Sequence, residues 1–299
     1  MKIVNFGSLN IDHVYSVPHM VKGGETISST NLATFCGGKG LNQSIAAARA
    51  GAEVYHAGMI GLDGAILREC LTENGVHLEY LREVDAPSGH AIIQVDPSGQ
   101  NCIIITGGTN YGITESYVDE VLKGLSEQDV VLVQNETSCV PYIIKQAHAK
   151  KARVVLNPSP ITPALVHYPL DLVDLLILNE IEGQMILEDT ECAMNDTELL
   201  AGLAARFPSA EIVLTLGKSG VWHQKNKVQS HHGIYNVPVV DTTAAGDTFC
   251  GYFLAAQAMG LSTEECLRRA SIASSIAVSK KGAAASIPHL TDVLAFEPK

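Results

Sequence analysis

Short apolar runs rich in β-branched residues recur along the chain and predict strands. Several are apolar at successive positions, which is expected of parallel strands buried on both faces. The runs are Lys2–Phe6, Val54–Met59, Asp129–Val133, Arg153–Asn157, Leu175–Leu178 and Glu211–Leu216. Segments of helical period alternate with them, such as Leu41–Ala50 and one that begins at Ser262 with Glu265 three residues later, a capping box. The alternation predicts an α/β fold of three layers with a mostly parallel central sheet.

Two stretches depart from this alternation. Residues 11–35 hold short extended pieces and turn glycines, and residues 89–106 predict a hairpin of Ala91–Val95 and Asn101–Thr106. Pro97 and Gly99 stand at the second and fourth positions of its turn, which suits a type I turn. We expect these stretches to form a small β-sheet that covers a ligand cleft as a lid, with a plain edge hairpin as the alternative. No linker is visible, so we predict one domain over residues 1–299 with an inserted lid.

Composition narrows the class of protein. The chain has 299 residues, 46% of them hydrophobic and 17% charged, which is globular rather than disordered. The net charge of −12 and the lack of Lys and Arg runs argue against nucleic-acid binding. No apolar run approaches the roughly 20 residues of a membrane helix, and the opening residues lack the apolar stretch of a signal peptide. Seven cysteines without a C-x-x-C pair indicate free thiols, so we expect a cytoplasmic protein without a membrane partner.

The segment Asp241–Phe249 carries the most informative chemistry. It reads D-T-T-A-A-G-D-T-F and lies between an extended run, Ile234–Val240, and a predicted helix, Thr248–Met259. The small residues before Asp247 let a ligand approach the backbone, and free N–H groups at a helix N-terminus bind phosphate. Asp247 could then accept the proton of a substrate hydroxyl as its oxygen attacks a phosphoryl group. The alternative is that Asp247 only caps the helix.

A second candidate site follows the first strand and the first glycine-rich segment. Gly37–Gly40 leads into a helix that carries Asn42, but it is not a Walker A loop. Its glycines let the chain pass close to a small polyol, and the Asn42 amide can both donate to and accept from hydroxyls. Asn10 and Asp12 lie beyond the carboxyl end of the first strand, where ligands of α/β sheets bind. Turn formation is the alternative for both.

Further polar residues follow other predicted strands. Glu136 could be another hydroxyl ligand, and a carboxylate at Glu182 could hold a magnesium-bound water. Thr215–Gly220 offers glycines for nucleotide contact, or else a hairpin turn, because Val221–Lys225 predicts a following strand. Asp241 either orients its loop, joins a monovalent-cation site or forms an Asx-turn.

Taken together, these segments resemble the ribokinase family of sugar kinases, the PfkB type. Gly37–Gln43 resembles its first signature and Asp241–Phe249 its second, and the resemblance runs nearly from end to end. It implies the ribokinase fold and an ATP-dependent kinase for the primary hydroxyl of a small sugar, in the first place D-ribose, which gives ribose 5-phosphate. Deoxyribose, fructose, a keto-sugar acid or a nucleoside are alternative substrates, and a non-catalytic sugar-binding regulator is a further alternative.

The resemblance also implies a role for each matching residue. Asp247 would be the catalytic base, with an anion hole at Ala244, Ala245 and Gly246. Sugar binding is implied for Asn10, Asp12, Gly38, Lys39, Asn42 and Glu136. Contacts to ATP are implied for Asn179, Thr215, Gly217, Lys218, Gly220 and Ser271, and a magnesium role for Glu182. A potassium site is implied at Asp241, Thr243, Ala277, Lys280, Gly282 and Ser286, and a homodimer through the lid.

Three positions depart from the family pattern. Asn135 and His90 are polar where an apolar residue is expected, and Ser271 stands where relatives vary in an adenine contact. His90 lies in the lid hairpin, so it could shift the preference away from ribose. The alternative is a solvated strand residue.

Overall fold

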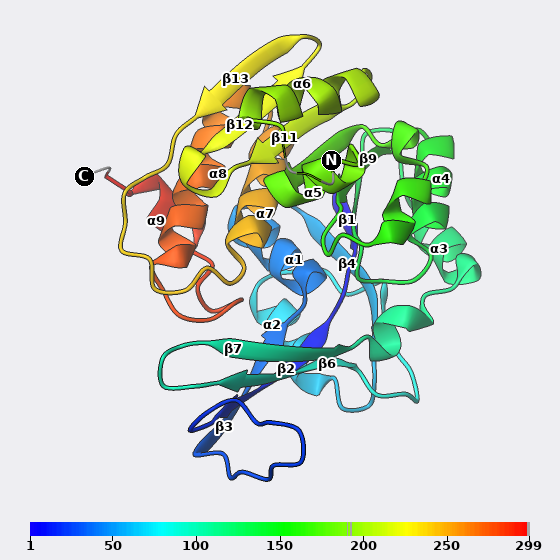
Figure 1. The fold of residues 1–299 in the computed structure, drawn as a ribbon. Helices are drawn as coiled ribbons and strands as arrows, with labels where there is room; N and C mark the ends of the chain where they lie inside the picture. Colours follow the sequence, from blue (N-terminus) through cyan, green and yellow to red (C-terminus); the bar gives the residue numbers. More distant parts are fainter. Residues whose placement is uncertain (190, 192, 298–299) are drawn as a thin grey trace.

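The computed structural model describes residues 1–189, 191 and 193–297, so Cys192, one of the expected free thiols, lies outside the described residues. A nine-stranded sheet runs through the middle of the molecule (Figure 1). Its strands are β1 (Ile3–Phe6), β4 (Val54–Ile60), β5 (Leu81–Glu83), β8 (Val130–Gln134), β9 (Arg153–Asn157), β10 (Leu175–Asn179), β11 (Glu211–Thr215), β12 (Val221–Lys225) and β13 (Val228–His232). Their order is β13-β12-β11-β10-β9-β8-β1-β4-β5, parallel from β11 to β5. The predicted α/β class with a mostly parallel sheet is confirmed.

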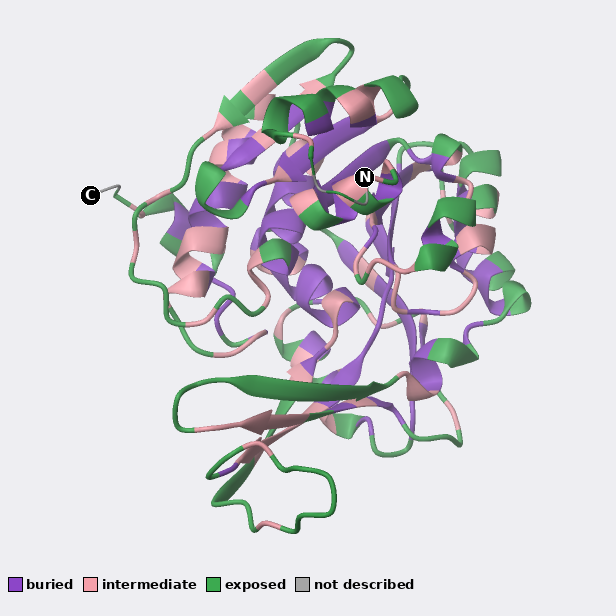
Figure 2. Cartoon of the chain, in the orientation of Figure 1, coloured by how far each residue is buried: buried purple, intermediate pink, exposed green. Residues whose placement is uncertain are grey.

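Alternate residues of the central strands enter two separate apolar clusters, one on each face of the sheet. In β1, Ile3 belongs to one cluster and Val4 to the other. The first is shared with α1 (Lys39–Arg49), α2 (Ala65–Glu73), α7 (Ala245–Ala258), α8 (Thr263–Val278) and α9 (Leu290–Leu294). The second is shared with α3 (Glu115–Leu122), α4 (Val140–Ala149), α5 (Glu180–Ile186) and α6 (Asp196–Arg206). Burial on both faces explains the unbroken apolar runs, and Figure 2 shows it as the purple interior.

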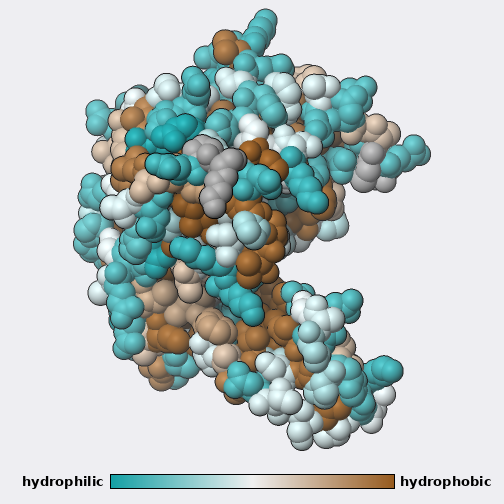
Figure 3. Space-filling view, turned by 90° about the vertical axis from the view of Figure 1, so that its left-hand side faces the viewer, coloured by the Kyte–Doolittle hydropathy of each residue, from teal (hydrophilic) through white to brown (hydrophobic). Residues whose placement is uncertain are grey.

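A second sheet projects from the body. It has the order β3-β2-β6-β7, with β2 (Asn10–Ser16), β3 (Asn31–Gly37), β6 (Gly89–Val95) and β7 (Asn101–Thr106). These strands come from the two stretches that broke the alternation, and every residue of β7 is exposed. Figure 3 shows a deep notch between this sheet and the body. We call the four-stranded sheet the lid.

Some predicted boundaries were wrong. Ile234–Val240 forms no strand, and its chain crosses the surface as a loop. The helix expected from Leu41 begins at Lys39, and the one expected from Thr248 begins at Ala245. Ser262 accepts from the N–H of Glu265 at 3.3 Å, but the Glu265 carboxylate pairs with two arginines of α8, so the N-cap forms without the predicted box. None of the helices in the described part of the chain is long and apolar enough to cross a membrane.

Candidate active site

The end of β1 meets the start of α1 through two glycines. A Cβ added to Gly7 would lie 2.5 Å from the Cα of Gly40, and one added to Gly40 would lie 2.3 Å from the Cα of Gly7. The backbone N–H of Leu41 then donates to the carbonyl of Ser8 at 2.9 Å. No larger residue fits at either position, so this contact places the first turn of α1 at the carboxyl edge of the sheet.

The carboxylate of Asp247 lies in the first turn of α7 and is held by α1. Its side chain is 7% exposed. Asn42 Nδ2 donates to one oxygen at 3.0 Å, and Gln43 Nε2 donates to the other at 2.8 Å. The helix is capped at Ala244 without a side-chain bond, so the capping alternative for Asp247 is wrong. Both oxygens face the amides of the first glycine-rich segment, which brings the two predicted motifs together.

The backbone before Asp247 is open to a ligand. Ala244 has a left-handed conformation with φ 59°, and a Cβ added to Gly246 would meet nothing within 4 Å. The N–H of Ala245 makes a long bond of 3.3 Å to the carbonyl of Thr242, while those of Ala244 and Gly246 find no acceptor among the described residues. Free N–H groups at a helix N-terminus carry a partial positive charge, so this turn can accept an anion.

Asn10 and Asn42 bring amide groups to the same edge. The Oδ1 atom of Asn42 is buried and has no partner among the described residues, so it can accept from a ligand hydroxyl. Asn10 Oδ1 accepts from Asn110 Nδ2 at 2.8 Å, and Asn110 Oδ1 accepts from the N–H of Leu9 at 2.9 Å. Asn110 therefore fixes the start of β2. It lies in η1 (Gly108–Gly112), far along the sequence from Asn10, and no local motif pointed to it.

Two carboxyl groups of this edge ionise with difficulty. Burial, and secondarily the charge of Glu136, raises the pKa of Asp12 to about 6. Burial likewise raises the pKa of Glu136, although its carboxylate accepts from the Ser8 hydroxyl and, at 3.0 Å, from the N–H of Lys39. Hydroxyl donors from a polyol would favour the charged form of both groups.

The ammonium group of Lys39 lies among carboxylates. Burial lowers its pKa, but the surrounding negative charges more than offset this and raise the pKa overall. Those charges belong to Asp247, Glu136 and Glu182. Lys39 therefore stays cationic. It lies close to the expected base Asp247, to the expected sugar ligand Glu136 and to Glu182, the expected magnesium residue.

Asn179 and Glu182 form the capping box of α5. Asn179 Oδ1 accepts from the N–H of Glu182 at 2.9 Å, and the Glu182 carboxylate accepts from the N–H of Asn179 at 3.0 Å. The box places the Glu182 carboxylate at the carboxyl end of β10. Burial raises its pKa, so a nearby cation would stabilise its charged form.

The segment Thr215–Gly220 connects two antiparallel strands, β11 and β12, through a short 3-10 turn. The hairpin alternative is thus confirmed. Gly217 and Gly220 both have positive φ (49° and 86°), and a Cβ on Gly217 would meet nothing within 4 Å. Thr215 Oγ1 donates to the carbonyl of Leu178 at 3.3 Å, which ties this turn to the end of β10. Lys218 is exposed in the same turn.

Asp241 joins the loop before α7 to the turn after α8. Its carboxylate accepts from the N–H of Thr243 and from that of Gly282, each at 2.9 Å. The bond to Thr243 is the Asx-turn that was the alternative. Burial raises the pKa of Asp241, but the Thr243 hydroxyl, which donates at 2.6 Å, and the two N–H donors outweigh it and lower the pKa overall. Asp241 is therefore a charged carboxylate that holds the two loops together.

The remaining residues of the potassium prediction lie in or beside the turn after α8. Lys280 donates its N–H to the carbonyl of Ala277 at 3.0 Å. Ser286 is fully buried, and its hydroxyl donates to the carbonyl of Ala283 at 2.8 Å. Within the described ranges, no group of three or more His, Cys, Asp or Glu side chains could hold a metal ion. A potassium site here would therefore depend on carbonyl oxygens.

The first of the three departures from the family pattern, His90, does not point at Asp12 of the proposed sugar residues. His90 pairs in register with Ile11, whereas Asp12 pairs with Ala91, so His90 lies on the opposite face of the lid from Asp12. Its Nδ1 atom is 3.2 Å from the carbonyl of Ser88. The hypothesis that His90 selects the sugar is therefore not supported by its placement.

Asn135 and Ser271 have structural surroundings. Asn135 Nδ2 donates to the carbonyl of Pro160 at 2.7 Å, and its Oδ1 accepts from the Tyr168 hydroxyl at 3.0 Å. It therefore holds the loop after β9. Ser271 is buried in α8, three residues before Ser274, whose hydroxyl donates to the carbonyl of Ala245 at 3.1 Å.

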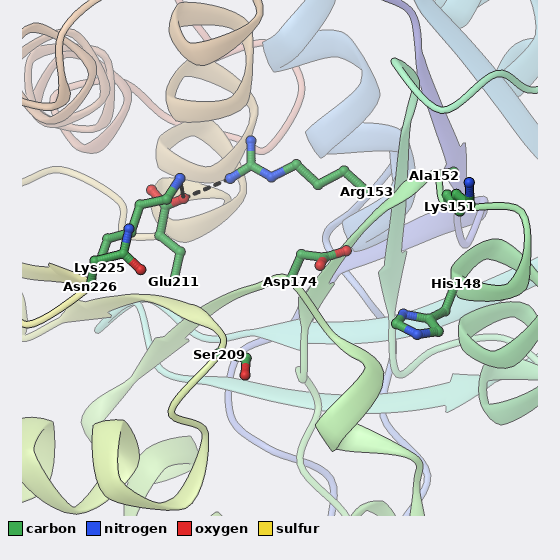
Figure 4. A pocket seen from close by; sticks show the side chains of 9 residues that line it. All are labelled: His148, Lys151, Ala152, Arg153, Asp174, Ser209, Glu211, Lys225 and Asn226. Atoms are coloured by element: carbon green, nitrogen blue, oxygen red, sulfur yellow. Dashed lines mark hydrogen bonds and ion pairs between the residues drawn. The ribbon is translucent and has the colours of Figure 1, made fainter.

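A pocket of about 450 Å³ lies at the amino ends of β9, β10 and β11, away from Asp247. Figure 4 shows Lys225 and Arg153 converging on Glu211. Glu211 is 2% exposed, and its ion pairs with Arg153 and Lys225 measure 2.7 and 2.9 Å. Burial raises the pKa of Glu211, but these partners and His223 outweigh it and lower the pKa to about 2. Two of the cations of this pocket are thus already paired with a carboxylate of the protein.

Comparison with known proteins gives the class of protein to which this fold belongs. Residues 1–290 match the model of the pfkB family of carbohydrate kinases, so the chain belongs to this family. Such an enzyme is a phosphotransferase with an alcohol group as acceptor.

Relatives called ribokinase match nearly the whole chain. The ribokinase of Haemophilus influenzae is 36% identical over 297 residues, which cover 97% of this chain and 96% of the relative. The structure of Arabidopsis thaliana ribokinase complexed with ribose and ATP has a TM-score of 0.87 at 32% identity, with 99% of each chain covered. That of Cryptococcus neoformans ribokinase with ADP has a TM-score of 0.86 at 33% identity, with 98% of each covered.

Proposed function

We propose that the chain transfers the γ-phosphoryl group of ATP to the primary hydroxyl of D-ribose and so forms ribose 5-phosphate. The observation that carries the proposal is the placement of Asp247. Its carboxylate is fixed by two amides of α1 at the start of α7, beside N–H groups that can accept an anion. A base and an anion hole at one helix terminus suit attack of an alcohol on a phosphoryl group. The ribose and ATP named for the Arabidopsis relative support this substrate pair.

In this proposal Asp247 accepts the proton of the hydroxyl as its oxygen attacks. Ala244, Ala245 and Gly246 stabilise the charge of the transferred group through their N–H groups. Sugar contacts come from both sides of the notch. They are Asn10 and Asp12 of the lid strand β2, and Gly38, Lys39, Asn42 and Glu136 of the body.

The nucleotide lies, we propose, against Asn179, the hairpin turn after β11 and α8. The contacts are those of Asn179, Thr215, Gly217, Lys218, Gly220 and Ser271. The buried oxygens of Glu182 fit a magnesium ion, directly or through water, because magnesium prefers carboxylate and water oxygens. Bound magnesium would supply neutralisation of the phosphate charges. The Asp241 loop and the turn after α8 suit a potassium ion, with Asp241, Thr243, Ala277, Lys280, Gly282 and Ser286 around it.

Two further properties belong to the proposal. The six described cysteines are free thiols, which fits a reducing cytoplasm. The exposed apolar side chains of β7 suit a homodimer formed through the lid.

The test of this function is a turnover assay on a panel of sugars, joined to one substitution. With ATP and magnesium, ribose should give the highest kcat/KM among ribose, deoxyribose, fructose and inosine. Asp247→Asn should reduce kcat about 10²- to 10⁴-fold, because an essential base is lost, while calorimetry still detects ribose binding. Turnover of inosine without turnover of ribose would replace the substrate, and full activity of Asp247→Asn would remove the proposed base.

A further inference from the structure

Gln43 holds the carboxylate of Asp247, and other buried side chains set the orientation of the Gln43 amide. Gln43 Nε2 donates to Asp247 at 2.8 Å and to Asn157 Oδ1 at 2.9 Å. Gln43 Oε1 accepts from Gln134 Nε2 at 2.8 Å. Gln43 and Gln134 are 0% and 1% exposed. If the Gln43 amide turned over, its oxygen would face the carboxylate, and the two acceptors would repel each other.

The orientation can be traced to a buried histidine. His56 Nε2 is 3.1 Å from the carbonyl of Gly7, which can only accept, so Nε2 carries a proton. Burial lowers the pKa of His56 to about 4, so the ring is neutral at pH 7 and its Nδ1 accepts. The Ser44 hydroxyl, 2.8 Å from Nδ1, must therefore be the donor.

From Ser44 each bond determines the direction of the next. Asn5 Nδ2 donates to the Ser44 oxygen at 2.9 Å and to the carbonyl of Gly40 at 2.8 Å. Asn5 Oδ1 therefore faces Gln134, which must present its Nε2 and does so at 2.9 Å. The second hydrogen of that Nε2 binds Gln43 Oε1, which leaves the Nε2 of Gln43 for Asp247. We call His56, Ser44, Asn5, Gln134 and Gln43 the amide relay.

We propose that Gln134 and Gln43 are positioning residues for phosphoryl transfer. Gln134 fixes the direction of the Gln43 amide together with Asn157, whose Nδ2 donates to the carbonyl of Ile177 at 2.8 Å and whose Oδ1 therefore faces Gln43. Gln43 in turn holds the Asp247 carboxylate where it meets the hydroxyl. Neither belongs to the proposed sugar set. This inference rests on the proposed role of Asp247 as the base.

Two variants of Gln134 separate its effect on the orientation of the Gln43 amide from the effect of its own packing. Gln134→Met keeps the length and removes the donor, so Gln43 loses one of its two orienting bonds and kcat falls about 10- to 100-fold, the scale of a misplaced reacting group. Gln134→Glu keeps the shape but reverses the polarity, because a carboxylate accepts where the amide donated. Gln43 then turns its Nε2 toward the new carboxylate and its oxygen toward Asp247, and kcat falls further than in Gln134→Met. The KM for ribose stays within about twofold in both.

A double variant and a packing control complete the test. Gln43→Met lowers kcat by itself, and adding Gln134→Met to it has little further effect, because Gln134 acts through Gln43. Val131→Ala shortens a buried side chain on the opposite face of β8, away from the face that carries the relay. It lowers thermal stability and leaves kcat unchanged.

The Gln134 and Gln43 variants test the positioning role, and Asp247→Asn tests the proposed base on which that role depends. A kcat for Gln134→Glu equal to that of the unaltered protein overturns the inference, and so does a smaller loss than in Gln134→Met. If circular dichroism shows that the Gln134 variants do not fold, Gln43→Met decides, and an unchanged kcat overturns the inference. Activity that survives Asp247→Asn instead removes the proposed base itself.

Discussion

At the scale of single residues, Asp12 has unusual chemistry for a side chain on a lid strand. Its carboxyl belongs to β2, yet burial against the body, followed by the charge of Glu136, raises its pKa to about 6 from 3.8. A Cβ added to Gly37 of β3 would lie 2.0 Å from an Asp12 oxygen, so only glycine leaves room for this carboxyl. Asp12 thus titrates in a range where a small change of pH alters its charge.

Ribose binding should weaken as the pH falls through about 6. Hydroxyls that donate to a carboxylate stabilise its charged form, so ribose competes with the proton for Asp12. Below pH about 6 the dissociation constant should rise by up to about tenfold per pH unit, and above pH about 7 it should level off. Calorimetric titration with ribose alone, from pH 5 to 8, measures this without turnover.

Asp12→Asn is the control for that dependence. It should bind ribose more weakly and with a smaller slope. Glu136 faces the same cleft, and burial also raises its pKa, so a residual slope in Asp12→Asn would report Glu136. Equal affinity of the unaltered protein at pH 5 and pH 7.5 would exclude Asp12 as a sugar ligand.

At the scale of elements, α1 and α7 both begin beside Asp247, and each follows a residue with a positive φ. Gly38 turns the chain into α1 with φ 98°, which glycine adopts freely. Ala244 turns it into α7 with φ 59°, a conformation that costs a residue with a side chain about 1 kcal/mol. Strain of this kind gathers at functional sites, and here it leaves the N–H groups of the first turn open to the notch.

Gly246→Ala should separate stability from activity. The added methyl meets no atom of the protein, and alanine restricts the unfolded chain, so stability should rise by about 0.4–1 kcal/mol. The same methyl occupies the space proposed for the phosphoryl group, so kcat should fall at least about tenfold. Chemical denaturation and steady-state kinetics measure the two effects. Gly233→Ala, also in open space, is the matched control and should keep full activity. An active Gly246→Ala enzyme would contradict the proposed anion hole.

The elements show what a sequence can and cannot reveal about such a site. Asp247 and its flanking small residues are contiguous, so their chemistry could be predicted from local spacing. The relay could not, because Gln43 and Gln134 lie 91 positions apart and meet only where helix α1 packs on the sheet at the end of β8. The face of His90 depends on the register of β2 with β6, which alternation alone leaves open. The capping box at Ser262 failed because Glu265 found arginine partners on its own helix.

At the scale of the whole molecule, the lid and the body share one site. β2 starts at Asn10 and β3 ends at Gly37, so both lid strands run directly into the notch. The outer strand β7 is different, because every one of its residues is exposed and it presents a row of isoleucines. Ile103, Ile104 and Ile105 are 49%, 59% and 60% exposed on an unpaired edge. An apolar edge strand of this kind invites pairing with another chain, so this edge suits the proposed homodimer.

Ile103→Lys should convert the proposed dimer to a monomer. A lysine on the edge strand opposes pairing by its charge and by the cost of burying it, so the dimer dissociation constant should rise at least about 100-fold. Light scattering after gel filtration and sedimentation equilibrium measure the change. Val228→Lys is the matched control, because Val228 is 65% exposed on β13, the edge of the other sheet, and should leave the dimer intact. A dimer that persists in Ile103→Lys and dissociates in Val228→Lys would move the interface from the lid to the body, and the exposed isoleucines would then have to serve closure of the notch.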